Sequence, residues 1–223
     1  MRPLSSVIAA ALLATTVPAF AQTAPTSPSP ISRVDVTGTL GWFNANKSDL
    51  DSQSYNDWYS RSLHGGLLAG WYWTDNLKTE VEFGGSTRAT VRTYRQVVIN
   101  GQNASDFAAH DFSTRKLAVS QLYQGYRNQW VHPYIGVGVE TTWERHAEDH
   151  SPIFWYDSAA RVSRQVVPRR LVGPRTETTV RALATVGFKA YMTRRAFFRG
   201  DFRMAFRGGV DEVLLRCGFG VDF

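Results

Sequence analysis

The chain has 223 residues, of which 43% are hydrophobic and 20% are charged, with a formal net charge of +6 and one cysteine. This length suits one domain or at most two small ones, and the apolar content is too high for a disordered chain. A single cysteine excludes a disulfide framework and a cysteine-built zinc site. A mean hydropathy of −0.27 excludes a polytopic helical membrane protein.

Residues 1–21 have the pattern of a secretory signal peptide. Arg2 supplies the positive start, residues 7–17 form a compact apolar run, and Ala19 and Ala21 are small residues at the positions that a signal peptidase reads. The run is too short to cross a bilayer as a helix, which needs about 20 residues, although a retained anchor is the alternative. Residues 22–32 are rich in Pro, Ser and Thr, so we expect a flexible segment before a folded domain over residues 33–223.

Eight segments of this domain alternate between apolar and polar residues. In residues 133–143, for example, Ile135, Val137 and Val139 share one face, and Tyr134 and Glu140 share the other. Strands of about 10 residues with this alternation can form the wall of a membrane barrel. The sequence therefore predicts an all-β fold, an eight-stranded antiparallel transmembrane β-barrel. The segments are 33–43, 58–73, 77–84, 115–124, 133–143, 178–192, 198–206 and 212–223.

The polar faces of these strands carry charges of both signs together with many glycines, which favours a narrow interior filled by side chains. Each buried charge is costly to desolvate, so we expect the charges to pair. An ordinary solvated face on a soluble barrel is the alternative. The predicted interior network consists of Glu80, Glu82, Glu140, Arg181, Lys189, Arg199, Asp201, Arg203 and Arg216.

The connections alternate in length, as outer membrane barrels require, with short periplasmic turns and longer extracellular loops. Short turns are expected at 74–76, 127–129 and 193–195. The other connections are expected at 44–57, about 86–114, about 146–177 and a brief hairpin at 208–209. Aromatic residues gather near both predicted ends of the strands, where amphipathic rings meet the lipid headgroups.

Three motifs are similar to those of the OmpA-like and OmpX-like eight-stranded outer membrane β-barrels. Residues 70–77 (GWYWTDNL) resemble the periplasmic turn of that group, and residues 132–139 (HPYIGVGV) resemble the entry to its fifth strand. The terminal GFGVDF resembles the signal that the barrel assembly machinery recognises, with Phe219, Val221 and Phe223 as its alternating apolar residues. The resemblance spans residues 33–223 and implies anchoring, adhesion or binding of external partners.

A search for catalytic residues identifies none. His64 lies on an inward face with Ser60 and Ser62, where hydrogen bonding to an interior neighbour is the expected role. The late strands lack the adjacent His and Ser of lipid A deacylases, and no phosphate-binding glycine loop is present. Residues 146–150 contain two histidines and two acidic residues that could bind a metal on a helix, but Pro152 favours a solvated loop. We therefore predict no catalytic site, no cofactor and no metal site.

A run of arginines follows in the same predicted loop. Arginine binds phosphate through bidentate, charge-assisted hydrogen bonds, so at the outer rim these residues are candidates to contact lipopolysaccharide. A solvated, mobile loop is the alternative, and export argues against nucleic acid as a partner. The arginines are Arg161, Arg164, Arg169, Arg170 and Arg175.

The sequence thus predicts a non-enzymatic protein of the Gram-negative cell outer membrane with a plugged, charge-paired lumen. It would act as a structural or surface-interaction (adhesion or envelope) protein through its extracellular loops. A narrow small-solute channel and a membrane-embedded lipid A-modifying enzyme are the alternatives. Expected partners are outer membrane lipids including lipopolysaccharide, the barrel assembly machinery and an unknown extracellular partner.

Overall fold

The computed structural model describes residues 33–46, 58–99, 101–125, 130–157 and 161–223. The signal peptide, the segment 22–32, the turn at 127–129 and most of the connection 44–57 lie outside the described residues. No helix in the described ranges is long and apolar enough to cross a membrane. The described ranges contain strands β1 (Val34–Asn46), β2 (Trp58–Tyr72), β3 (Leu77–Ser86), β4 (Ala89–Ile99), β5 (Gln102–Gln124), β6 (Val131–His150), β7 (Ile153–Asp157), β8 (Val162–Val167), β9 (Arg170–Tyr191), β10 (Ala196–Phe206) and β11 (Val210–Asp222).

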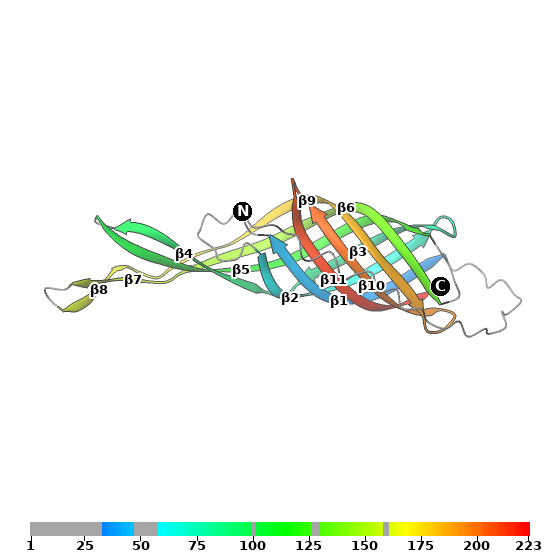
Figure 1. Cartoon of the computed structure of the whole chain (residues 1–223), viewed down its shortest axis with the longest axis horizontal. Helices are drawn as coiled ribbons and strands as arrows, with labels where there is room; N and C mark the ends of the chain where they lie inside the picture. The colour runs from blue at the N-terminus through cyan, green and yellow to red at the C-terminus, as the bar shows by residue number, and fades with distance from the viewer. Residues whose placement is uncertain (1–32, 47–57, 100, 126–129, 158–160) are drawn as a thin grey trace, which may run out of the picture. The chain divides into compact units, whose positions relative to one another are not determined.

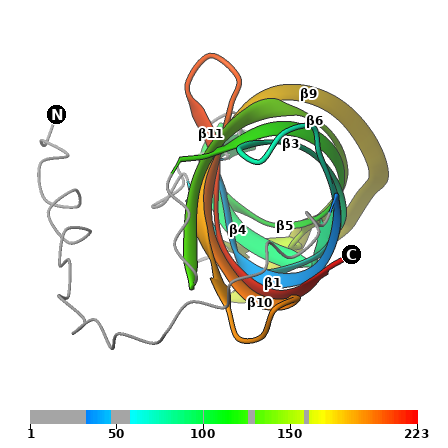
Figure 2. The same cartoon turned by 90° about the vertical axis from the view of Figure 1, so that its right-hand side faces the viewer.

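Eight of these strands close into a barrel. The antiparallel order β3-β2-β1-β11-β10-β9-β6-β5 returns to its start because β3 also pairs with β5. Figure 2 shows the ring of strands that results. The predicted eight-stranded antiparallel β-barrel is confirmed, and closure leaves no unpaired sheet edge in the wall.

Strand β5 is long enough to serve two neighbours. Its second half pairs with β3, from Gly85 opposite Arg115 to Leu77 opposite Tyr123. Its first half pairs with β4, where Ala89 lies opposite Phe112. Strands β5, β6 and β9 therefore run past the barrel wall, and β4 takes the place of β3 beside β5 (Figure 1).

This arrangement corrects two predicted loops. Most of 86–114 is the β4–β5 hairpin, and 146–177 comprises the end of β6, the β7–β8 hairpin and the start of β9. We call the paired segments 89–99, 102–114, 144–150 and 170–178 the external sheet. The sequence does not reveal it because this sheet stands beyond the wall, where no apolar face is required and the alternation that marks a membrane strand is weak.

The barrel is apolar outside and ionic inside. Leu40, Leu67 and Ile135 are 69%, 66% and 61% exposed on the outer face, whereas Arg199 and Lys189 are fully buried in the interior. A soluble barrel would reverse this arrangement, with its apolar side chains inside. Trp42 and Trp73, 64% and 65% exposed, lie on opposite ends of the wall, as expected for aromatic girdles.

Two of the three predicted periplasmic turns lie in the described residues, and they share one hydrogen-bond pattern. The Thr74 hydroxyl accepts hydrogen bonds from the backbone N–H groups of Asn76 and Leu77, at 3.3 and 3.0 Å. The Thr193 hydroxyl accepts hydrogen bonds from the backbone N–H groups of Arg195 and Ala196, at 3.3 and 2.9 Å. A threonine that satisfies the amides of its own turn explains why both turns are tight. The predicted turns at 74–76 and 193–195 are confirmed.

Candidate functional site

The barrel interior holds balanced charge. Among the described residues, seven cationic side chains and seven carboxylates are buried, so the formal charge of these buried groups is zero although the chain carries +6. Bringing each of these ions out of water costs several kcal/mol unless it is paired. The cations are Lys78, Lys116, Arg181, Lys189, Arg199, Arg203 and Arg216, and the carboxylates belong to Asp35, Glu80, Glu82, Glu140, Asp201, Glu212 and Asp222.

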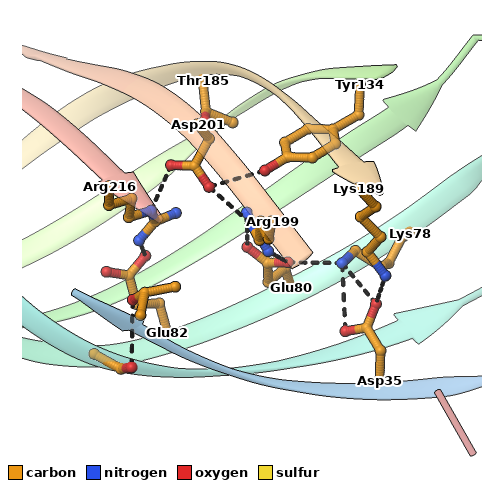
Figure 3. Close-up of polar contacts among 12 residues, drawn as sticks. Asp35, Lys78, Glu80, Glu82, Tyr134, Thr185, Lys189, Arg199, Asp201 and Arg216 are labelled. Carbon is orange, nitrogen blue, oxygen red and sulfur yellow. Dashed lines mark hydrogen bonds and ion pairs between the residues drawn. The ribbon is translucent and has the colours of Figure 1, made fainter. Parts of the chain in front are cut away.

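Arg199 on β10 and Glu80 on β3 form the central pair, across the interior from one another. The guanidinium donates two hydrogen bonds, 2.6 and 2.9 Å long, to the two carboxylate oxygens of Glu80. Lys78 donates to the same carboxylate at 2.7 Å (Figure 3). A bidentate arginine–carboxylate pair is the strongest and most directional of the common ion pairs.

A second carboxylate, Asp201, joins this pair to the next. It accepts hydrogen bonds from the Nε groups of Arg199, at 2.7 Å, and Arg216, at 2.5 Å. The Tyr134 hydroxyl donates a third hydrogen bond to it at 2.8 Å, and Figure 3 shows all three converging on Asp201. Three donors compensate one buried carboxylate, which is the condition for keeping it ionised away from water.

The ion pairs continue toward both ends of the barrel. Toward the external sheet, Glu82 contacts Arg203 and Arg216, each at 2.6 Å. Arg203 also contacts Glu140, and Arg181 contacts Glu212 at 2.9 Å. Toward the turns, Asp35 contacts Lys78 at 2.9 Å and also contacts Lys189. The network thus runs through the interior.

The structure places all nine residues of the predicted interior network on the inward face, each with at least one ion-pair partner. Sequence reasoning missed five further members. Side-chain alternation could have identified them, because residues an even number of positions apart on a strand point to the same face. Each of the five lies at such a spacing from a predicted member or from another inward residue of its strand. They are Asp35, Lys78, Lys116, Glu212 and Asp222.

His64 is buried on the inward face, and neither of its ring nitrogens has a hydrogen-bond partner within the described ranges. The hydroxyl of Ser62 donates instead to the backbone oxygen of Thr87, at 2.9 Å. The interior hydrogen bond expected for His64 is therefore not found, and no Ser62–His64 pair is formed. A nucleophile requires a base within hydrogen-bond reach, and the geometry does not provide one here.

The residues 146–150, expected in a loop, form the end of β6. Successive side chains of a strand point to opposite faces. His146, Glu148 and His150 therefore share the face that continues the barrel interior, where they meet His110 of β5. Asp149 lies on the other face and pairs with Arg169, at 2.5 Å. Sequence reasoning missed His110 because 36 residues separate it from His146.

The pKa values of His110 and Glu148 are both lowered, but for different reasons. Burial lowers the pKa of His110, which favours its neutral imidazole. Burial alone would raise the pKa of Glu148, but the hydrogen bond to His150 and the nearby positive charges outweigh it and lower that pKa. Glu148 is therefore ionised at neutral pH.

The structure does not gather the five predicted arginines into one patch. Arg161 and Arg164 belong to the exposed β7–β8 hairpin region. Arg169 directly precedes β9, and Arg170 begins it. Arg175 faces the histidine cluster and contacts Glu148 at 3.4 Å. All five lie in or beside the parts of the chain that extend past the wall. At the other end, Phe219, Val221 and Phe223 project outward from the end of β11, exposed by 63%, 40% and 66%.

An apolar outer face, an ionic interior and eight antiparallel strands define this chain as an outer membrane type of β-barrel. The family model "Outer membrane protein beta-barrel domain" matches residues 7–223, so the chain belongs to that family. The resemblance to OmpA-like and OmpX-like eight-stranded barrels is confirmed. None of the curated proteins compared with the chain matches it.

Several solved structures are similar to this chain. Neisserial surface protein A (NspA) is 14% identical, with a TM-score of 0.51 over 85% of this chain and 97% of that chain. The attachment invasion locus protein Ail of Yersinia pestis is 9% identical, with a TM-score of 0.46 over 86% and 99%. The N-terminal barrel of Pseudomonas aeruginosa OprF is 13% identical, with a TM-score of 0.44 over 84% and 97%. At 14% identity, the similarity to NspA concerns the fold alone.

Proposed function

We propose that this protein is a non-enzymatic outer membrane barrel, exported by a cleaved signal peptide, whose ion-paired interior is a plug. It acts as a structural or surface-interaction protein through its external sheet. The observation that carries the proposal is the neutral network of buried ion pairs, because eight strands leave an interior just wide enough for side chains to fill. Long arginine and lysine side chains occupy the space that a solute would need.

The surface that would meet a partner is the external sheet with the β7–β8 hairpin. These segments expose large apolar side chains, including Phe107, Phe154 and Leu171, at 56%, 59% and 70%. Ile99, Phe107 and Phe154 also line a cleft of about 270 Å³ between the β4–β5 hairpin and β7. Apolar groups gathered on a surface outside the membrane are typical of protein interaction sites.

Two measurements separate this proposal from its alternatives. Purified barrel in a planar lipid bilayer should give no stable ion conductance, whereas the small-solute channel requires it. Mass spectrometry of lipid A from cells with and without the protein should show no difference, whereas a lipid A-modifying enzyme would change it. For the surface role, a short Gly-Ser turn replacing residues 153–167 should abolish adhesion of cells that carry the barrel and leave the amount of folded barrel unchanged.

Lipopolysaccharide is the proposed lipid partner, and the five arginines support this because all of them extend past the wall. Changing them together to glutamine should weaken binding to purified lipopolysaccharide and reduce its dependence on salt. The matched control is glutamine at Arg194 and Arg195, which are exposed in a short turn at the opposite end. Unchanged binding with an unchanged salt dependence in the five-fold variant would refute the contact.

A further inference from the structure

The face of the external sheet that continues the barrel interior gathers metal-ligating side chains from two strands. His110 of β5 lies directly opposite Glu148 of β6, and Phe112 lies opposite His146. Because the side chains of these four positions share one face, two imidazoles and one carboxylate converge. His110 and His146 are only 8% and 9% exposed, although they stand beyond the membrane wall.

The ligand atoms are spaced as one small cation requires. His110 Nδ1 is 3.1 Å from His146 Nε2, and this nitrogen is 3.7 Å from an oxygen of Glu148. All three ligand atoms lie within 4.8 Å of one another. In a tetrahedral zinc site with bonds of about 2.05 Å, the ligand atoms are about 3.3 Å apart. Small side-chain shifts would therefore bring all three atoms onto one ion.

Neighbouring side chains contact these three ligands and hold their orientation. Thr93 Oγ1 lies 3.0 Å from His110 Nε2, which leaves Nδ1 directed at the other two ligands. His150 lies 3.3 Å from the second oxygen of Glu148, and Phe112 stacks on His146 with ring centroids 4.5 Å apart. Metal-binding histidines and carboxylates have such outer partners, which fix the ring orientation and the tautomer.

We propose that His110, His146 and Glu148 bind one divalent transition-metal ion of the zinc class, with a fourth position left for water or for a group from another molecule. Two imidazoles and one carboxylate suit zinc and disfavour calcium and magnesium, which prefer sets of oxygen ligands. A three-ligand site with an open position can bind a further ligand, as catalytic zinc sites do.

The positive charge of Arg175 disfavours a bound metal ion. Arg175 Nη2 lies 3.4 Å from Glu148 Oε1 and 3.5 Å from His146 Nδ1, so its charge competes with the metal for the same carboxylate. Its side chain is 69% exposed and can turn into solvent. Removal of this charge should therefore strengthen metal binding, which a merely structural histidine cluster does not predict.

The test uses the full-length mature barrel without a histidine tag, stripped with a chelator and folded in detergent micelles. Isothermal titration with zinc chloride should show one site per chain, and cobalt(II) should give the visible absorption of a tetrahedral ion. His146→Ala and Glu148→Gln should each lower zinc affinity by at least about 100-fold, and Thr93→Val by about 10-fold, since loss of an outer partner costs 10- to 100-fold. Arg175→Met should raise the affinity.

The control is His132→Ala, which changes a histidine at the turn end of β6 and should leave zinc affinity unchanged. Heat-modifiable migration on a gel establishes that each variant is folded, so a loss of binding reports on the site. No zinc binding by the folded wild type would overturn the proposal. Binding that persists in both His146→Ala and Glu148→Gln would overturn it as well, because the ion would then be held elsewhere.

Discussion

The central ion pair of the interior allows a quantitative test of whether the buried ion pairs stabilise the barrel. Replacing Arg199 by methionine keeps most of the side-chain volume but removes two hydrogen bonds to Glu80 and one to Asp201. Loss of one partner of a buried pair costs about 3–5 kcal/mol. Glu80 keeps Lys78 at 2.7 Å, and Asp201 keeps Arg216 at 2.5 Å, so neither carboxylate is left alone. We therefore expect about 3 kcal/mol, the lower end of that range.

The assay is urea unfolding of the folded barrel in lipid vesicles, followed by tryptophan fluorescence, with the free energy of unfolding extrapolated to water. Adding Glu80→Gln to Arg199→Met should recover at least about 1 kcal/mol, because the second change removes the carboxylate that the first left underpaired. Arg207→Met, at an exposed position, is the control and should stay within about 0.5 kcal/mol of the wild type. If Arg199→Met is as stable as this control, the interior ion pairs do not stabilise the barrel.

Three further predictions concern the wall and its assembly. Gly84→Val should prevent folding, because a Cβ at Gly84 would lie 2.9 Å from a backbone oxygen of β2. Heat-modifiable migration on a gel should then be lost. The control is Gly209→Ala, where the added Cβ meets open space, and it should migrate normally. Val137→Arg should lower the free energy of unfolding in lipid by about 2–4 kcal/mol, because Val137 is 66% exposed on the outer face near the middle of the wall. An equal loss in lipid and in detergent would contradict a membrane-facing position. Deletion of Phe223 should reduce the folded barrel in outer membrane fractions while refolding in detergent remains unchanged, and normal fractionation would argue against the assembly signal.

The architecture of the wall could be predicted because its determinants are local. A residue's place inside or outside the barrel depends only on its parity along the strand, so Glu80 and Arg199 could be assigned to the interior without knowledge of the pairing. The same holds for the turns at Thr74 and Thr193, where one side chain satisfies the amides of its own turn. The predicted strand ends were less accurate at the external side, where β5, β6 and β9 continue beyond the lipid.

Contacts across the barrel depended on the tertiary structure. The pairing of Glu80 with Arg199 joins residues 119 positions apart, and it follows from the strand tilt and the closing register between β3 and β5. The approach of His110 to His146 requires that β5 and β6 stay paired beyond the wall, and Thr93 reaches His110 because β4 replaces β3 as the other neighbour of β5. The sequence by itself determined which side chains face the interior, because side-chain alternation is a property of each strand alone. Only the tertiary structure decided which of them meet, because register and closure are set by all eight strands together.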